Sequence, residues 1–272
     1  MSRVLITGSA DGLGLLAAQR LIAEGHHVVL HARSNTRSHD ALHAASEASA
    51  VLIADLSHLS ELERLATQAN RLGRFDAVIH NAAIGARQPR RTLTRDGLCE
   101  VFTVNVIAPY VLTALIEAPC RLVYLSSAMH RSGDPDLSDI NWLARAWDPR
   151  QAYADSKLFC AMLGFAAARL VPGTICNVVE PGWVPTRMGG PAAPEDLRLG
   201  ADTQAWLAVS NEKGARRTGR YLYHRAERAT HPAVRDVALQ DALVELCAEL
   251  TGVRLGLPAP KAAAAPPFAA TL

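Results

Sequence analysis

Short apolar runs alternate with longer helical patterns along most of this 272-residue chain. The runs are RVLIT (3–7), HVVLHA (27–32), AVLIA (50–54), DAVIH (76–80), CRLVYLSS (120–127) and TICNVV (174–179). Runs this short, rich in Val, Ile and Leu, are typical of parallel strands that are buried on both faces. The helical stretches between them, such as 12–24 and 57–72, have the length that a right-handed crossover needs. The sequence therefore predicts an α/β fold with a doubly wound parallel sheet of about seven strands, flanked by helices in three layers.

Composition excludes several classes of protein. Hydrophobic residues make up 49% of the chain and charged residues 20%, which is ordinary for a soluble globular protein. The net charge of +2 is too small to indicate binding to nucleic acid or to a membrane surface. No apolar run reaches the length of about 18 residues that a membrane span needs, and residues 1–7 are too short for a secretory signal. We therefore expect no nucleic-acid partner and no membrane span.

The cysteines and histidines give little support for a metal site. The five cysteines are odd in number and none are in a CxxC spacing, and the ten histidines include no HExxH pattern. We expect thiols in a reducing, cytoplasmic environment, with no disulfide scaffold and no bound metal. The cysteines are Cys99, Cys120, Cys160, Cys176 and Cys247.

The chain shows no internal repeat, and we expect one domain over residues 1–255. Residues 256–272 are rich in Ala and Pro and are expected to form a flexible tail. The stretch 130–150 is rich in Gly, Pro and Asp and resembles an inserted loop with at most one short helix. Residues 182–215, a Pro- and Gly-rich loop leading into a helix near 195–209, are expected to close over a substrate. Residues 217–232 fit a last strand and a basic surface loop.

The first strand runs into a glycine-rich loop, TGSADGLG (7–14), and then into a helix. Gly8 permits a tight turn, Gly12 lets the backbone approach a ligand, and Gly14 allows the helix to pack closely on the strand. The N-terminus of the following helix directs free N–H groups at the loop, which suits a pyrophosphate. The alternative is a plain tight turn, but the position after a strand and before a helix favours dinucleotide binding.

The end of the second strand, LHARS, bears on which dinucleotide binds. An NAD site usually has an acid there to hold the ribose 2′-hydroxyl, but this chain has Ala32 followed by Arg33. An arginine can pair with a 2′-phosphate, so we expect a preference for NADP(H), with NAD(H) still open. Asp11, inside the glycine loop, argues the other way because it would repel a phosphate. Asp55 either holds the adenine amino group or caps the helix that begins near Ser57.

Six motifs in this order resemble the short-chain dehydrogenase/reductase family, over residues 3–190. They are TGSADGLG (7–14), HNAA (80–83), VNVIAP (104–109), LSS (125–127), YADSK (153–157) and EPGWVPT (180–186). The long stretch before YADSK is also similar to the retinol-dehydrogenase-like branch. The resemblance implies a Rossmann-type fold and an NAD(P)-dependent oxidoreductase acting on an alcohol, aldehyde or ketone, and it leaves a homodimer or a homotetramer open.

The resemblance also implies the site residues. Tyr153 and Lys157 match the catalytic Y-x-x-x-K pair, Ser127 the catalytic serine, and Asn105 the asparagine of the helix before that strand. The residues implied to bind the cofactor are Gly8, Ser9, Asp11, Gly12, Leu13, Gly14, Arg33, Asp55, Leu56, Asn81, Ala82, Ala83, Tyr153, Lys157, Pro181, Gly182, Val184 and Thr186.

Tyr153 and Lys157 are four residues apart, so a helix would place them on one face. A free tyrosine titrates near pH 10 and is a poor base at neutral pH, but a nearby ammonium favours its phenolate form. Such a pair can therefore work as a general acid or base. The resemblance adds that Lys157 could hold the nicotinamide ribose hydroxyls. A half-buried ring beside a solvated amine is the alternative for such a pair taken alone.

Ser127 would stabilise the charge that develops on the substrate oxygen. Asn105, in an apolar helical pattern, needs polar partners, and the resemblance gives it a structural and proton-relay role. Trp183, Met188 and Trp206 are candidates for an apolar substrate lining or for ordinary packing. The sequence thus predicts an oxidoreductase with Tyr153 as acid and base. The alternative is a catalytically silent dinucleotide-binding regulator, and a serine hydrolase is disfavoured because no G-x-S-x-G motif occurs.

Overall fold

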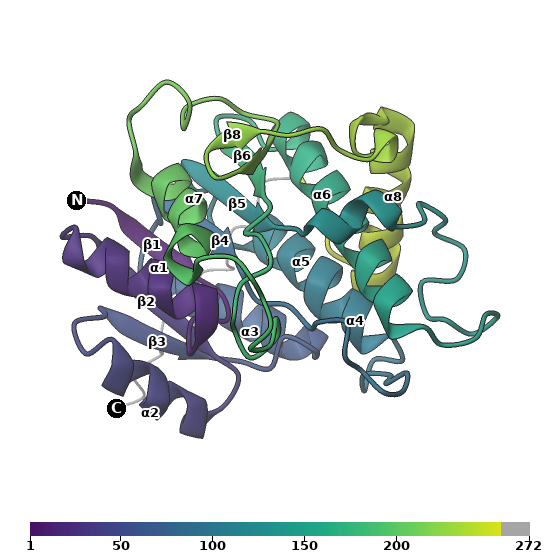
Figure 1. Cartoon of the computed structure of the whole chain (residues 1–272), viewed down its shortest axis with the longest axis horizontal. Helices are drawn as coiled ribbons and strands as arrows, with labels where there is room; N and C mark the ends of the chain where they lie inside the picture. Colours follow the sequence, from purple (N-terminus) through teal and green to yellow (C-terminus); the bar gives the residue numbers. More distant parts are fainter. Residues whose placement is uncertain (257–272) are drawn as a thin grey trace, which may run out of the picture.

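The computed structural model describes residues 1–256, which contain one eight-stranded sheet (Figure 1). The strand order is β3-β2-β1-β4-β5-β6-β7-β8; the first seven strands are parallel and β8 pairs antiparallel with β7. The strands are β1 (Arg3–Ile6), β2 (His27–Ala32), β3 (Ala50–Ile53), β4 (Ala77–His80), β5 (Arg121–Leu125), β6 (Ile175–Val179), β7 (Arg220–Tyr223) and β8 (Ala226–Glu227). The predicted doubly wound α/β fold is confirmed, with the short β8 as an added hairpin strand.

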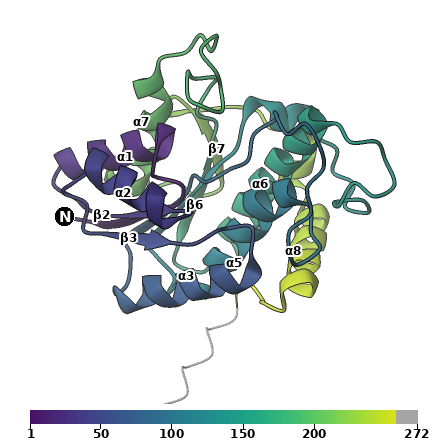
Figure 2. The same cartoon turned by 90° about the horizontal axis from the view of Figure 1, so that it is seen from below.

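Helices cover both faces of the sheet and give the three layers (Figure 2). The helices α1, α2 and α7 pack with one buried apolar cluster, and α3, α5 and α6 pack with another on the opposite face. The α-helices are α1 (Gly12–Ala23), α2 (Asn35–Ala44), α3 (Leu59–Arg71), α4 (Glu100–Phe102), α5 (Ala108–Leu115), α6 (Pro149–Leu170), α7 (Leu197–Val209) and α8 (Val237–Thr251). The other turns are the π-helical η1 (Thr103–Ile107) and the 3-10 helices η2 (Ala128–Ser132) and η3 (Pro232–Arg235).

The order of the strands reverses at β1. From there the chain moves outward through β2 and β3, then returns to place β4 on the other side of β1. In open α/β sheets, ligands bind beyond the carboxyl ends of the strands at this switch point. The segments that leave β1 and β4 here are the glycine loop and the loop containing Asn81.

All six apolar runs form strands, but the sequence prediction missed α2 and α8. Helix α2 is mostly polar, with only two residues buried, so its apolar periodicity is weak. The helices predicted near 57–72 and 195–209 begin at Leu59 and Leu197. The 130–150 insertion is irregular between η2, which ends at Ser132, and α6, which begins at Pro149. The predicted tail lies outside the described residues except for Gly256.

Helix α6 is largely buried, on the face of the sheet that also bears α3 and α5. Its residues from Ala152 to Ala167 are buried apart from the half-buried Tyr153. The sheet covers it on one side, and α8 and η3 pack on it from the other. Because α6 is closed in within one subunit, the side chains that it directs toward the sheet are held in place.

Candidate active site

Helix α6 places Tyr153 and Lys157 beside the carboxyl end of β5. Asp148 caps the helix through the N–H groups of Arg150 and Gln151. The Lys157 side chain is buried, and its ammonium donates to the carbonyl of Leu125 at 2.7 Å. The same nitrogen lies 5.7 Å from the centre of the Tyr153 ring. The predicted proximity of the phenol and the ammonium is therefore present in the structure.

Ser127 follows β5 by two residues and is the N-cap of η2. Its hydroxyl accepts a hydrogen bond from the Met129 N–H at 3.3 Å. Since Lys157 binds the carbonyl of Leu125 and η2 packs against α6, the serine and the Tyr–Lys pair share one neighbourhood. The neighbouring Ser126 is buried, and its hydroxyl donates to the Lys157 carbonyl at 2.8 Å, which fixes the strand end to the helix.

Asn105 lies in η1, where the helix leading into α5 widens into a π turn. Its side-chain oxygen accepts from the Ile84 N–H at 2.8 Å, and its amide donates to the Ile84 carbonyl and to the Ser156 hydroxyl. The Ser156 hydroxyl in turn donates to the Tyr153 carbonyl. Asn105 therefore ties the loop after β4 to the helix of the Tyr–Lys pair. This agrees with the structural role that we expected, and the relay role stays a prediction.

The glycine loop, which connects β1 to α1, packs against the residues that follow β4. Gly8 has a φ of +63°, and a Cβ atom there would lie 2.8 Å from the Cα of Ala82. A Cβ on Gly14 would lie 2.5 Å from the carbonyl oxygen of Gly8, so both positions require glycine. The Asn81 amide donates to the carbonyls of Thr7 and Gly8. Asn81 thus fixes the shape of the loop, and its expected contact with the cofactor stays a prediction.

His31, near the end of β2, contacts this loop and was missed by the sequence prediction. Its Nδ1 accepts from the Gly8 N–H at 2.9 Å, and its Nε2 lies 3.0 Å from the Ala54 carbonyl. These partners require a neutral ring with the proton on Nε2. Burial accordingly lowers the pKa of His31 to about 4. Ser9 is also buried, and its hydroxyl donates to the Ile6 carbonyl and accepts from the His31 N–H. Both side chains brace the loop from behind.

The N-terminus of α1 is left open in the way that a phosphate site requires. Its N-cap, Asp11, makes no capping bond through its side chain within the described residues, and the first turn contains no acid. The N-caps of α2, α6, α7 and α8 accept N–H groups through their side chains, whereas the N-caps of α3, α4 and α5, like that of α1, do not. Gly12 adds a φ of +54°. The open N–H groups and the bare backbone fit the pyrophosphate of a dinucleotide.

Charged groups gather where the adenosine end of a dinucleotide would lie. Arg33 is exposed at the start of the loop after β2. Asp11 is paired with Arg37 of α2, with a nitrogen–oxygen distance of 2.5 Å, and Arg187 lies 3.6 Å from the same carboxylate. The repulsion that Asp11 would exert on a phosphate is therefore offset by two arginines that the sequence prediction did not include.

Asp55 supports the turn that leads into α3. Its carboxylate accepts from the N–H and the hydroxyl of Ser57. Burial works to raise the pKa of Asp55, but these hydrogen bonds outweigh it and hold the pKa below its ordinary value. Asp55 does not cap α3, because that helix begins at Leu59 with His58 as its N-cap, and a contact of Asp55 with the adenine amino group stays a prediction. Leu56 is buried nearby, so a contact with a ligand would come from its backbone.

The loop after β6 folds back over the glycine loop. Thr186 lies against Gly12, 3.5 Å from where a Cβ would be. Gly182 has a φ of +87° beside the Glu195 carboxylate, and Val184 is buried against Gly200. The same Gly200 packs against Leu13 of α1. Residues 181–190 thus lie over the glycine loop and the start of α1.

The candidate substrate lining separates into two parts. Trp183 is 54% exposed and Met188 is 42% exposed, and Met188 also packs on Gly85. Trp206 is buried in the core with its ring against Gly214, which favours ordinary packing, the second of its two alternatives. It faces inward because α7 presents this side to the body of the protein. Ala83, which follows β4, is half-buried.

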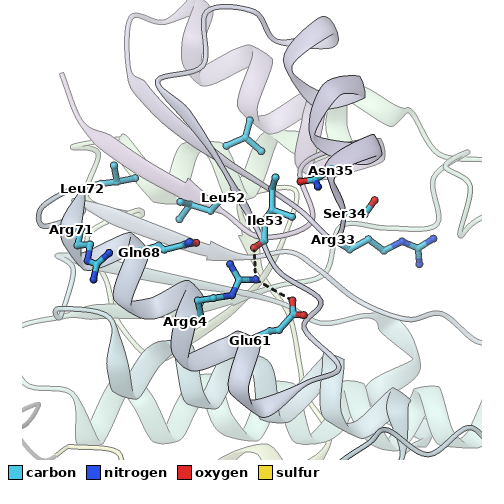
Figure 3. Close-up of a pocket in the computed structure, with 11 residues that line it drawn as sticks. Arg33, Ser34, Asn35, Leu52, Ile53, Glu61, Arg64, Gln68, Arg71 and Leu72 are labelled. Atoms are coloured by element: carbon cyan, nitrogen blue, oxygen red, sulfur yellow. Dashed lines mark hydrogen bonds and ion pairs between the residues drawn. The ribbon is translucent and has the colours of Figure 1, made fainter.

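A cavity of about 780 Å³ lies beside the edge strand β3 and not at the Tyr–Lys pair (Figure 3). Arg64 donates there to the Ile53 carbonyl and pairs with Glu61, which protects an exposed strand edge. Arg33 borders the cavity but points away from Arg64. Within residues 1–256, no three His, Cys, Asp or Glu side chains gather as metal ligands, and no helix is long and apolar enough to cross a membrane.

This arrangement is typical of one class of protein, the dinucleotide-binding α/β oxidoreductases. The family model described as short chain dehydrogenase matches residues 2–120. Short-chain dehydrogenase chry4 of Gibberella zeae is 40% identical over 262 residues, covering 95% of this chain and all of the relative. The chain belongs to the short-chain dehydrogenase/reductase family, whose members are NAD(P)-dependent oxidoreductases.

More distant relatives agree with this assignment. Retinol dehydrogenase 13 of Mus musculus is 27% identical over 286 residues, covering 93% of this chain and 84% of the relative. The crystal structure of an uncharacterized protein from Mycobacterium paratuberculosis is 25% identical, with a TM-score of 0.80, covering 94% of this chain and 96% of that chain. The family prediction is confirmed, and the retinol-dehydrogenase-like branch is supported only by distant similarity.

Proposed function

We propose that this protein is an NADP(H)-preferring dehydrogenase/reductase that transfers hydride between nicotinamide C4 and the carbon of an alcohol or carbonyl group. The observation that carries the proposal is the buried Lys157 ammonium, held by the Leu125 carbonyl beside the Tyr153 ring. Burying an ammonium costs folding free energy, which one carbonyl acceptor offsets only in part. We therefore infer that Lys157 serves a further purpose. Binding ribose hydroxyls and favouring a phenolate would supply that purpose.

Each residue then has a defined task. The nicotinamide supplies or accepts the hydride when it is bound. Tyr153 gives a proton to the substrate oxygen in reduction and takes it back in oxidation, and Lys157 favours the phenolate in between. Ser127 donates a hydrogen bond to the same oxygen and stabilises its developing charge. Asn105 keeps the helix of the pair in place through Ser156.

The preference for NADP(H) rests on the arginines at the adenosine end. Arg33 is exposed where the 2′-phosphate of NADP(H) would lie, and Arg37 and Arg187 neutralise Asp11. The absence of an acid at the end of β2, where Ala32 stands, also disfavours the hydroxyl of NAD(H).

We propose an apolar or aromatic alcohol, aldehyde or ketone as substrate, as in the retinol-dehydrogenase-like branch. Trp183 and Met188 offer exposed apolar surface on the loop that covers the site. All five cysteines are free thiols, which supports a reducing, cytoplasmic location. A homodimer or homotetramer would need a surface other than α6, because α8 already covers that helix within the subunit.

The competing proposal is a dinucleotide-binding regulator without turnover. Oxidation of NADPH with a panel of apolar carbonyl compounds, comparing the wild type with Tyr153→Phe, separates the two. Removing the proton donor should lower kcat by about 10³-fold and leave NADPH binding nearly unchanged. Equal turnover by both proteins would remove the catalytic assignment, and NADPH binding without any turnover would favour the regulator.

A further inference from the structure

Behind Ser127 lies a group of buried polar side chains that the proposed mechanism does not use. His130 belongs to η2, Glu180 follows β6, and Tyr221 belongs to β7; none is more than 4% exposed. Buried polar groups need hydrogen-bond partners, and these three find them in one another and in the backbone of Ser127. Three separate elements therefore meet at the back of the proposed catalytic serine.

The Tyr221 hydroxyl is the centre of this group. It lies 3.0 Å from each of three atoms: the Ser127 carbonyl oxygen, the His130 Nδ1 and the Glu180 Oε2. The rings of Tyr221 and His130 are also in contact, with 4.5 Å between their centres. One hydroxyl thus links the serine, the histidine and the carboxylate.

The hydrogen-bond partners determine where the protons lie. The His231 N–H donates to the His130 Nε2 at 3.3 Å, so the His130 proton is on Nδ1, which lies 2.7 Å from the Ser127 carbonyl oxygen. Burial lowers the pKa of His130, in agreement with a neutral ring. Burial raises the pKa of Tyr221, so its hydroxyl keeps its proton and donates it to the Glu180 carboxylate, the only charged acceptor of the three.

Glu180 connects this group to the loop that covers the cofactor site. Its carboxylate pairs with Arg131 at 2.9 Å, and its N–H donates to the Leu222 carbonyl at 2.8 Å. The next two residues are Pro181 and Gly182, where that loop begins. The end of η2 and the start of the loop are therefore held together through one carboxylate.

We propose that Tyr221, with His130 and Glu180, is a positioning group that holds the Ser127 segment and the Pro181–Gly182 loop in one fixed relation. Under the proposed function, on which this inference rests, that relation sets the substrate oxygen against the nicotinamide. The carbonyl of Ser127 accepts from the His130 Nδ1–H and lies 3.0 Å from the Tyr221 hydroxyl, so the backbone of Ser127 is held in place from behind. Small displacements of reacting groups are costly, so loosening this group should slow the chemical step.

The test is Tyr221→Phe, with Tyr124→Phe as the matched control. Tyr124 is on the adjacent part of the sheet, equally buried, and its hydroxyl lies 2.7 Å from the Thr113 hydroxyl, away from Ser127. Tyr221→Phe should lower kcat by about tenfold and leave the KM for NADPH within about twofold, whereas the control should keep both. The fluorescence of the reduced nicotinamide in bound NADPH should also fall in Tyr221→Phe, while the affinity for 2′,5′-ADP stays unchanged.

A second pair of variants keeps the inference testable if Tyr221→Phe does not fold. An asparagine at position 130 can offer an N–H near the place of the histidine Nδ1, and a leucine cannot. His130→Asn should therefore retain several times more of the wild-type kcat than His130→Leu at the same thermal stability.

The inference is overturned if Tyr221→Phe keeps the wild-type kcat and nicotinamide fluorescence. It is also overturned if Tyr221→Phe and Tyr124→Phe lose activity equally and in proportion to stability, which would show ordinary packing. A wild type that binds NADPH but reduces no carbonyl compound would contradict the proposed function instead. In that case the nicotinamide fluorescence still decides whether Tyr221 positions the loop.

Discussion

The two ends of the proposed cofactor site are built in opposite ways. At the reactive end, Lys157 is 3% exposed, and its neighbours are fixed by hydrogen bonds between side chains and backbone. At the adenosine end, charges meet at the surface: the Asp11 side chain is 51% exposed and that of Arg187 is 78% exposed. The chemical step needs fixed geometry without water, whereas the choice of dinucleotide needs only charge of the right sign.

This difference predicts how each end should respond to change. A substitution at the buried end should alter rates greatly and depend little on salt. A substitution at the exposed end should alter the dissociation constant (Kd) of the dinucleotide modestly and depend strongly on salt, because water and ions screen surface charges.

The largest effect is expected for Lys157→Met. The substitution removes the ammonium and keeps most of the apolar stem, so kcat should fall by about 10³-fold, in line with the loss of one acid–base component. The unfolding free energy without ligand should be equal or higher, because replacing a buried charge with an apolar side chain is often neutral or stabilising. Steady-state kinetics and urea unfolding on the same samples test both statements. A variant that loses activity only because it unfolds would contradict the first.

The next effect concerns pH. His31 has a folded-state pKa of about 4 and an ordinary value of 6.5, so between these values the unfolded chain binds a proton that the folded chain does not. The contribution of His31 to the unfolding free energy is fully present above pH 6.5. It is lost as the pH falls through this window, by at most about 3 kcal/mol. Urea unfolding at pH 7 and pH 5 should therefore show a smaller loss in His31→Gln than in the wild type.

His80 serves as the control for this prediction. It is also buried, with its pKa lowered to about 3. Its Nε2 bonds to the Thr113 hydroxyl of α5 and not to the glycine loop. His80→Gln should reduce the acid sensitivity of folding in the same way. Only His31→Gln should change how NADPH affinity varies with pH, because only His31 accepts the Gly8 N–H. Identical binding profiles in the two variants would contradict this role of His31.

The sequence predicted the proposed catalytic residues better than it predicted the residues that hold them in place. Tyr153, Lys157, Ser127 and Asn105 are in motifs with fixed local spacing, and the structure brings all four to one place. His31, His130 and Tyr221 were missed because each acts through partners that are 23 or more residues away, or through backbone atoms that carry no sequence signal. Glu180 did have a local signal, since an acid at the end of an apolar strand must find a partner. Arg37 was missed because the polar helix α2 was itself missed.

The smallest effect is expected at the exposed end, where opposite charges should give opposite results. Arg33→Ala should raise the Kd of NADP by about tenfold and leave the Kd of NAD nearly unchanged, since only NADP has the 2′-phosphate. Asp11→Asn should lower the Kd of NADP by about two- to threefold, because it removes a repelling charge and frees Arg37 and Arg187 from their partner. Fluorescence titrations at low and high salt measure both. The two effects should shrink together as ionic strength rises, and a salt-independent loss in Arg33→Ala would instead place that side chain in a buried contact, which would remove the contrast between the two ends.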